Sequence, residues 1–288
     1  MSTPPPADVI APHDHTAADV DAPEELDRHV AAGSLAGLTV QGLRLAGADL
    51  SGVDVTGAWI AEHGPASVVG IMGGHAVRRG STAYRLAATL GWELARAGRL
   101  VVTGGGPGVM EAANLGAYLS ARSAAELGTA VDLLATAPDF RDHDPYTEAA
   151  LAVRDRFPAP GGGWTGGLAI PTWLYGHEPA NLFAGLIAKY FSNAIREDTI
   201  LRLARGGIVF AAGRAGTVQE VFQAATKTHY GTDGASGPFV FLDAAFWATG
   251  LPAPDLLRTL LASSPHGDLS TLVHVTDDAR EAIALLTA

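Results

Sequence analysis

The stretch Gly207–Glu220 constrains the fold of this chain most strongly. It reads Gly-Ile-Val-Phe-Ala-Ala-Gly-Arg-Ala-Gly-Thr-Val-Gln-Glu, which predicts a buried strand, a loop at Ala212–Gly216 and a helix starting near Thr217. Small residues in the loop let the backbone approach a ligand closely. The unpaired N–H groups and partial positive charge at the start of a helix suit a phosphate. Glu220 follows Thr217 by three residues, so the stretch predicts an anion-binding loop with a carboxylate beside it.

A second copy of this pattern lies upstream. Leu100–Thr103 is an apolar run rich in valine, Gly104–Gly108 is a glycine-rich turn, and Val109–Asn114 has helical character with Glu111 in its first turn. One glycine loop also serves as an ordinary turn, so a single copy says little about function. Two copies in one chain favour a two-sided pocket for a nucleotide or phosphosugar over plain connections between strands and helices.

Strands and helices alternate along most of the chain. The expected strands are Ser67–Met72, Leu100–Thr103, Leu168–Pro171, Ile208–Ala211, Phe239–Leu242 and Leu272–Val275. The expected helices are Thr82–Ala97, Met110–Ser120, Ala124–Ala135, Tyr146–Arg156, Asn181–Arg205, Thr217–Thr228, Pro254–Ala262 and Asp277–Leu286. This alternation predicts an α/β fold, namely a Rossmann-like, doubly wound parallel sheet with helices on both faces. Ligands of such sheets bind at the carboxyl ends of the strands, where both glycine loops fall.

The main domain is predicted over residues 65–288, after two other segments. Residues 1–23, rich in Pro, Ala, Asp and His, are expected to form a disordered tail, and residues 24–64 a separate amino-terminal segment. Glycines recur every five residues from Gly37 to Gly57, so residues 35–60 resemble pentapeptide repeats, which coil into a right-handed β-helix. A lone coil cannot bury its own core, so we expect this short β-helix-like segment to pack on the main domain or on a second subunit. The alternative is a pair of ordinary strands with glycine turns.

Composition argues against several classes of function. The formal net charge is −11 and no basic run occurs, so a nucleic-acid-binding surface is not expected. The chain has no cysteine, which excludes a thiolate metal site and a cysteine nucleophile. No apolar stretch is long enough to span a membrane, and residues 1–6 lack the features of a signal peptide. A cytoplasmic protein is therefore expected.

The two glycine loops together carry a resemblance to a known family. Thr103–Asn114, Thr-Gly-Gly-Gly-Pro-Gly-Val-Met-Glu-Ala-Ala-Asn, and Ala212–Glu220, Ala-Gly-Arg-Ala-Gly-Thr-Val-Gln-Glu, resemble the LOG ("lonely guy") phosphoribohydrolases, long mislabelled as lysine decarboxylases. The family hallmark is P-G-G-x-G-T-x-x-E, and the resemblance runs from about Ser67 to the end of the chain. It implies a homodimer or higher homo-oligomer that cleaves the N-glycosidic bond of a nucleoside 5′-monophosphate, such as a cytokinin nucleotide. The products are a free base and ribose 5-phosphate, and no metal or other cofactor is implied.

The resemblance also assigns roles to residues. The hallmark glutamate matches Glu220, and the catalytic arginine of the family falls on Arg196, with Arg202 as the alternative. A carboxylate can stabilise the oxocarbenium character that develops on the ribose, or deprotonate water. An arginine can pair with the phosphate or steady the leaving base. The residues expected to bind the phosphate or nucleotide are Gly73, Gly74, Gly104, Gly105, Gly106, Gly108, Glu111, Asn114, Gly213, Arg214, Ala215, Gly216 and Thr217. For Glu111, a helix-capping role is the alternative.

Two positions depart from the hallmark. Ala212 replaces its proline, which softens the turn, and Arg214 replaces its second glycine. Arg214 either adds a cation for the phosphate, or narrows the pocket, or demands a backbone conformation that non-glycine residues disfavour. This departure bears on catalysis more than on binding, and a non-catalytic nucleotide or molybdenum-cofactor carrier is the alternative function.

Several other residues have two interpretations each. Arg78 and Arg79 either steer a phosphate or form a surface charge pair, and Asp142–Asp144 is expected to be a solvated loop rather than a metal site. The loop Pro171–Pro179 either stacks its aromatic residues on a base or forms a packed turn before a helix. A pyridoxal-phosphate decarboxylase needs a Schiff-base lysine. The only two lysines, Lys189 and Lys227, are expected on helix surfaces away from the loops, which disfavours that function.

Overall fold

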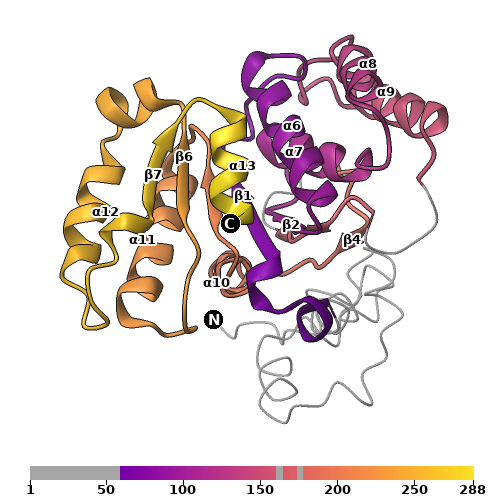
Figure 1. Ribbon diagram of the computed structural model, residues 1–288. Coiled ribbons are helices and arrows are strands. Elements are labelled where there is room, and N and C mark those ends of the chain that lie inside the picture. The colour runs from indigo at the N-terminus through magenta and orange to yellow at the C-terminus, as the bar shows by residue number, and fades with distance from the viewer. Residues whose placement is uncertain (1–58, 160–164, 174–177) are drawn as a thin grey trace, which may run out of the picture.

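Seven parallel strands form the centre of the described chain (Figure 1). The computed structural model describes residues 59–159, 165–173 and 178–288, so the predicted tail and nearly all of the predicted repeat lie outside the described residues. The strand order is β4-β3-β2-β1-β5-β6-β7. The strands are β1 (Val68–Met72), β2 (Leu100–Thr103), β3 (Leu168–Ala169), β4 (Leu186–Ile187), β5 (Ile208–Phe210), β6 (Phe239–Leu242) and β7 (Val273–Thr276).

Helices cover both faces of this sheet. They are α6 (Thr82–Arg96), α7 (Val109–Tyr118), α8 (Ala124–Leu134), α9 (His143–Arg156), α10 (Asn193–Leu203), α11 (Ala215–Tyr230), α12 (Ala253–Ala262) and α13 (Ala279–Thr287). Short helical turns occupy Pro65–Ser67, Phe246–Gly250 and Ser270–Leu272. Side chains of α6, α7 and α13 share one core with those of α8 and α9, whereas α10, α11 and α12 contribute to the other core. Figure 1 shows α6, α7 and α13 together in front of the sheet.

The central strand shows why the sheet must be covered on both sides. All five residues of β1 are buried. Val69 and Ile71 belong to the α6–α7 core, whereas Val68 and Met72 belong to the α10–α11 core, as the two-residue period of a strand requires. A continuous apolar strand of this kind is typical of parallel sheets buried on both faces. The predicted doubly wound α/β fold is therefore confirmed.

One predicted helix is wrong. Asn181–Arg205 was expected to be a single long helix, but it contains strand β4 at Leu186–Ile187 and only then α10, which begins at Asn193. The hydroxyl of Ser192 accepts a hydrogen bond from the Ile195 amide and caps this later start. Short apolar runs fit a buried strand and a helix almost equally well, and β4 is only two residues long. The other expected elements are present and differ at their ends by a few residues at most.

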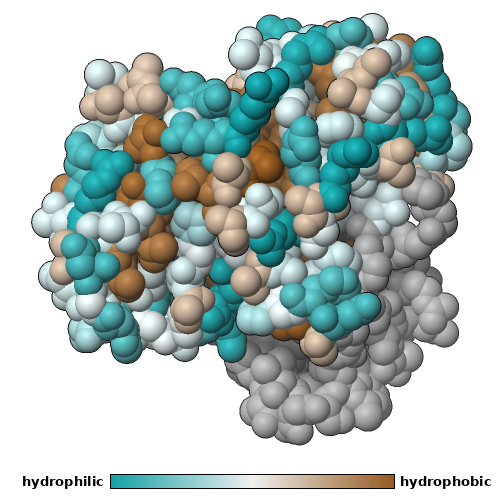
Figure 2. Space-filling view, viewed as in Figure 1, coloured by the Kyte–Doolittle hydropathy of each residue, from teal (hydrophilic) through white to brown (hydrophobic). Residues whose placement is uncertain are grey.

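The surface is mixed in character. Figure 2 shows one face, on which apolar residues gather mainly over α12, β7 and α13 among hydrophilic neighbours. The most exposed large apolar side chains, Leu151, Tyr230 and Leu256, lie on three different helices, α9, α11 and α12. Within the described ranges, no helix has the length and apolar character needed to cross a bilayer.

Candidate functional site

The loops that leave β1, β2 and β5 meet at the carboxyl edge of the sheet. In the sheet, β1 lies between β2 and β5. The chain continues from β1 to β2 on one side, and the strands from β5 onward lie on the other side. Ligands of open α/β sheets bind at such a topological switch point, which here is the β1–β5 junction. Gly74 follows β1, and its amide donates to the Ala212 carbonyl after β5 at 3.1 Å. The Gly74 carbonyl accepts from the Val109 amide at 3.3 Å, which ties in the loop after β2. The two expected glycine loops therefore flank the loop after β1, and both contact Gly74.

The loop after β2 requires glycine at its end. Gly108 has φ +71°, and a Cβ there would lie 2.5 Å from the Gly74 carbonyl oxygen. Residues other than glycine rarely adopt this backbone conformation, and a methyl group here would push the two loops apart. Gly108 thus permits the close approach that brings Gly73 and Gly74 beside Gly108 and Val109.

The loop after β5 leads into α11 without a side-chain cap. The helix begins at Ala215, two residues earlier than expected, and its N-cap residue Arg214 makes no side-chain capping hydrogen bond. A Cβ on Gly213 would lie 2.2 Å from the Thr217 hydroxyl oxygen, so glycine is needed at Gly213. No atom lies within 4 Å of a Cβ built on Gly216, so the surface beside the first turn is open. The first-turn N–H groups remain available to an anion.

Arg214 adopts a conformation open to any residue. Its φ is −113° and its ψ is −155°, which is ordinary extended backbone. The interpretation that Arg214 imposes backbone strain is therefore wrong. Its side chain is exposed, at the edge of the uncapped helix start.

Arg196 and Glu220 form a buried ion pair between α10 and α11. Arg196 Nη1 lies 3.1 Å from Glu220 Oε1. Arg196 Nε donates to the Ile170 carbonyl at 2.9 Å, and Nη2 lies 3.5 Å from the Gly104 carbonyl oxygen. The guanidinium thus joins the exits of β2 and β3 to the glutamate of α11. The alternative, Arg202, is exposed and lies 3.6 Å from Asp233, so Arg196 is the arginine beside Glu220.

Burial makes Glu220 a carboxyl that titrates near neutrality. Its exposed fraction is 7%, and this burial raises its pKa to about 7. Arg196 lowers the pKa and the negative charge of Glu197 raises it, but desolvation is the largest effect. A carboxyl with a pKa close to neutrality can both accept and donate a proton, which is what acid–base catalysis requires.

Glu197 is a member of this cluster that the sequence reasoning missed. It is 2% exposed, lies 3.8 Å from Arg196 Nη1, and accepts hydrogen bonds from Asn193 at 2.8 Å and from Gln219. Arg196 therefore lies between two buried carboxylates. The adjacent Arg-Glu pair, with an asparagine one turn earlier, was the signal available in the sequence.

Glu111 differs from the expectation that it faces the ligand. It is 1% exposed and accepts hydrogen bonds from Arg79 Nε at 2.9 Å, Tyr84 at 2.9 Å and Tyr146 at 2.6 Å. The Arg79 guanidinium also lies 3.1 Å from the centre of the Tyr146 ring. Burial raises the pKa of both tyrosines, which keeps them protonated as donors. Arg79, one of two candidates for steering a phosphate, is likewise buried here, whereas Arg78 is exposed.

Asn114 is also turned inward. It is fully buried; its Oδ1 accepts from the Thr103 hydroxyl at 2.7 Å and from Asn181 at 2.9 Å, and its Nδ2 donates to the Gly166 carbonyl at 2.6 Å. It connects β2 and α7 to the segments before β3 and before β4. Its side chain therefore supports the glycine loop from the interior of the protein.

A cavity of about 330 Å³ lies on the other side of the glycine loop, toward β3 and β4. Its walls include Gly104, Gly105, Trp173, Glu178, Asn181 and Lys189. Glu178 Oε1 lies 3.1 Å from His75 Nδ1, which connects this wall to the loop after β1. Part of the predicted base-stacking loop, residues 174–177, lies outside the described residues.

Lys189 is misplaced by the sequence reasoning. It lies just after β4 on extended backbone, rather than on a helix surface, and its half-buried side chain lines the cavity. Its Nζ lies 3.8 Å from the centre of the Trp173 ring, and burial lowers its pKa. The argument that no lysine lies near the loops is therefore wrong for Lys189.

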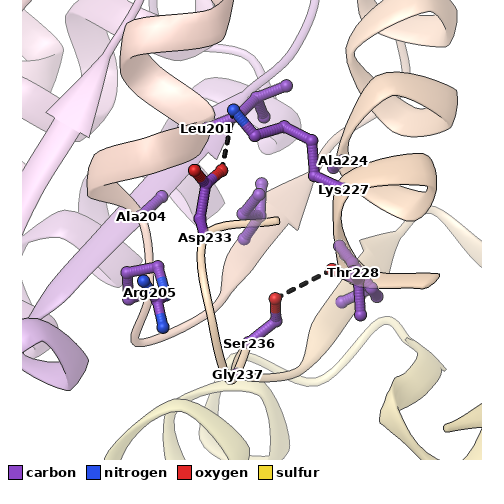
Figure 3. A pocket seen from close by; sticks show the side chains of 11 residues that line it. Leu201, Ala204, Arg205, Ala224, Lys227, Thr228, Asp233, Ser236 and Gly237 are labelled. Carbon is purple, nitrogen blue, oxygen red and sulfur yellow. Dashed lines mark hydrogen bonds and ion pairs between the residues drawn. The ribbon is translucent and has the colours of Figure 1, made fainter. Parts of the chain in front are cut away.

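Lys227 lies at the opposite edge of the sheet, as expected away from the loops. It lines a pocket of about 20 Å³ near the amino ends of β5 and β6, with Asp233 and Ser236 (Figure 3). Its ammonium lies 2.8 Å from Asp233 and 2.7 Å from Asp198. A space that holds about one water molecule, closed by paired charges, is a structural feature of the fold.

Asp142–Asp144 is part of a helix start. Asp142 is the N-cap residue of α9, and His143 and Asp144 are in its first turn. Over the residues that the structure describes, no group of three or more His, Cys, Asp or Glu side chains is placed to hold a metal ion.

The fold and the arrangement of loops at the carboxyl edge of the sheet together define a Rossmann-like α/β protein. Its glycine loops surround the β1–β5 junction. Residues 66–133 match the model of the SLOG cluster4 family. This match bears out the resemblance described above over the stretch that contains the first glycine loop. No curated protein matches the chain.

Solved structures that are similar to the chain include the following two. One is the Moco carrier protein from Chlamydomonas reinhardtii, with 21% identity, a TM-score of 0.44, and coverage of 75% of this chain and 93% of that one. The other is the molybdenum cofactor binding protein from the phototrophic bacterium Rippkaea orientalis, with 17% identity and a TM-score of 0.41. That match covers 76% of this chain and 94% of the other.

Proposed function

We propose that this protein binds a nucleoside 5′-monophosphate at the β1–β5 junction and hydrolyses its N-glycosidic bond. The products are the free base and ribose 5-phosphate. The observation that carries the proposal is the buried pair of Arg196 and Glu220, 3.1 Å apart, beside the uncapped start of α11. The resemblance to the phosphoribohydrolases assigns catalytic roles to the same two residues.

The 5′-phosphate would lie on the first turn of α11. Free N–H groups and the helix dipole favour a dianion there, and the space beside Gly216 is open. The exposed guanidinium of Arg214 lies at the same place and can pair with phosphate oxygens. In this role Arg214 supports phosphate binding where the family hallmark has glycine.

Glu220 would act on water at the sugar. It accepts a proton from the attacking water, whose oxygen forms the new bond to C1′ of the ribose. The base leaves with the electron pair of the broken C1′–N bond and takes up the proton that Glu220 has accepted, which returns Glu220 to its carboxylate form. The Glu220 carboxylate also stabilises the positive charge that develops on the ribose. Arg196 holds the carboxylate in place through its bonds to the carbonyls of Ile170 and Gly104.

A binding or carrier function without catalysis is the second candidate. It is favoured by the extent to which the pair is already engaged, because Arg196 is 6% exposed and contacts Glu220, Glu197 and two carbonyl groups. The ligand would then be a nucleotide or the molybdenum cofactor, held at the same loops.

A substrate panel separates the two functions. Purified protein is incubated with nucleoside 5′-monophosphates of different bases, and free base and ribose 5-phosphate are quantified. Hydrolysis is supported if the wild type and Glu148→Gln, a control at an exposed position, both release free base and ribose 5-phosphate. The rate of release by Glu220→Gln should then be at least a hundredfold lower. Saturable binding without product in any reaction supports the carrier function instead.

We also propose that the protein is a homodimer or higher homo-oligomer, as the family resemblance implies. Light scattering coupled to size-exclusion chromatography measures this directly. A mass equal to the chain mass of 29.6 kDa at micromolar concentration contradicts it.

A further inference from the structure

The cavity beside the first glycine loop contains a positive charge for which the described residues supply no neutralising partner. The side chain of Lys189 is half-buried in its wall, and the ammonium lies against the ring of Trp173. Within the described part of the chain, no carboxylate lies within ion-pair distance of Lys189 Nζ, and desolvation alone accounts for its lowered pKa. A cation held away from water in this way favours an anion as its partner.

The other charged groups around this cavity are already engaged. Glu178 lines the same wall, and its carboxylate lies 3.1 Å from His75, whose side chain is more than half exposed. Arg196 reaches the cavity only through Gly104, whose carbonyl oxygen lies 3.5 Å from its Nη2, and its charge is shared by Glu220 and Glu197. Among the described residues that line the cavity, Lys189 is therefore the cation available to a ligand.

The cavity also adjoins the proposed reaction site. Gly104 and Gly105 form its wall on one side, and Arg196 contacts Gly104 from the other side. A ligand seated on the first turn of α11 and beside Glu220 can therefore extend past the glycine loop toward Lys189. A cavity of about 330 Å³ accommodates a group considerably larger than a single water molecule.

We propose that this cavity is a second anion subsite, in which Lys189 binds a phosphate carried by the nucleotide in addition to its 5′-phosphate. The inference rests on the proposed function for the position of the first phosphate. It narrows the ligand class to nucleotides with two separated anionic groups, such as nucleoside 3′,5′-bisphosphates. The Trp173 ring, whose centre lies 3.8 Å from Lys189 Nζ, keeps the ammonium at the cavity wall.

The sequence itself provides a clean spectroscopic test. Lys189 and Lys227 are the only lysines in the chain, so protein labelled with ¹³C at the lysine ε-carbon gives two lysine side-chain signals. Lys227, paired with Asp198 and Asp233 at the opposite edge of the sheet, is the internal control. The probes are inorganic phosphate, adenosine 5′-monophosphate and adenosine 3′,5′-bisphosphate.

The expected result is a saturable shift of the Lys189 signal and a rise in its pKa with inorganic phosphate and with the bisphosphate. The Lys227 signal stays unchanged. Isothermal titration should give about tenfold tighter binding of the bisphosphate than of the monophosphate, since a charge-assisted hydrogen bond is added. Lys189→Met should abolish this preference, Lys189→Arg should retain it, and Lys227→Met should leave it unchanged.

Failure of the subsite and failure of the proposed function look different. If no nucleotide binds, the proposed function is refuted, and the inorganic-phosphate titration of wild-type protein still decides the subsite. A Lys189 signal that does not move with phosphate, or that moves together with that of Lys227, overturns the subsite. An equal bisphosphate preference in wild type and Lys189→Met overturns it as well.

Discussion

The raised pKa of Glu220 predicts how the stability of the protein depends on pH, whatever its substrate is. Its pKa is raised from an ordinary value of 4.5 to about 7, mainly by burial. A carboxyl with a raised folded-state pKa binds its proton more tightly in the folded than in the unfolded protein. Its contribution to stability is therefore complete below about pH 4.5 and is lost as the pH rises through about 7.

The size of this loss follows from the shift. Each pKa unit corresponds to about 1.4 kcal/mol, so a rise from 4.5 to about 7 makes the folded state about 3 kcal/mol less stable above pH 7 than below pH 4.5. Glutamine at this position keeps the shape and does not titrate. The stability of the wild type relative to Glu220→Gln should therefore fall by about 3 kcal/mol between pH 4.5 and pH 8.

Urea unfolding at a series of pH values measures this difference. The titration of all other groups cancels when the two proteins are compared, and Glu148→Gln, a change on the exposed face of α9, controls for the loss of one negative charge. A wild-type-to-variant difference that stays constant from pH 4.5 to pH 8 would falsify the buried, protonatable state of Glu220.

A second variant tests the role of Glu197. Its negative charge raises the pKa of Glu220, so Glu197→Gln should move the loss of stability to lower pH. If the protein hydrolyses nucleotides, the lower limb of its kcat/KM profile should move in the same direction. An unchanged pH window in both measurements contradicts the coupling between the two carboxylates.

Three further changes test the loops and their support. Arg79→Met leaves a buried carboxylate unpaired and should cost about 3–5 kcal/mol in urea unfolding, whereas Arg85→Met, at an exposed ion pair, should cost about 1 kcal/mol or less; equal costs contradict the buried pair. Gly213→Ala places a methyl group 2.2 Å from the Thr217 hydroxyl and should lower stability by about 1–3 kcal/mol, with a neutral result contradicting the tight loop. Arg214→Gly should change stability by about 1 kcal/mol or less but weaken phosphate binding in isothermal titration; an unchanged affinity contradicts the phosphate contact.

Strands β1, β2 and β6 were predictable because each is a continuous, largely apolar run next to glycine or proline. β1, β2 and β6 are continuous apolar runs of four or five residues, and each is buried throughout. β4 has only two residues, followed by Ala188-Lys189-Tyr190, and such a segment shows no period of its own. Apolar spacing that continues into a true helix then predicts one long helix where the chain has a strand and a shorter helix.

The site was predictable only in part, and for a similar reason. The approach of Arg196 to Glu220 follows from family motifs and from the rule that loops at the carboxyl edge meet. The partners of Glu111 and the position of Lys189 depend on contacts between distant segments. Arg79 and Tyr146 stand 32 and 35 residues from Glu111 along the chain, and no local pattern encodes their convergence.

The two glycine loops look alike in sequence, yet their glutamates have different chemistry because their partners differ. Glu111 accepts hydrogen bonds from a guanidinium and two phenols, and Arg79 neutralises its charge at the shortest contact of the network. Glu220 is also buried, with 7% of its surface exposed against 1% for Glu111, but it shares its arginine with Glu197 and two carbonyl groups, so its charge is only partly compensated. Full compensation fixes Glu111 as an anchor for the first loop. Partial compensation leaves Glu220 titratable, which is why the chemistry proposed for this protein belongs to the second loop.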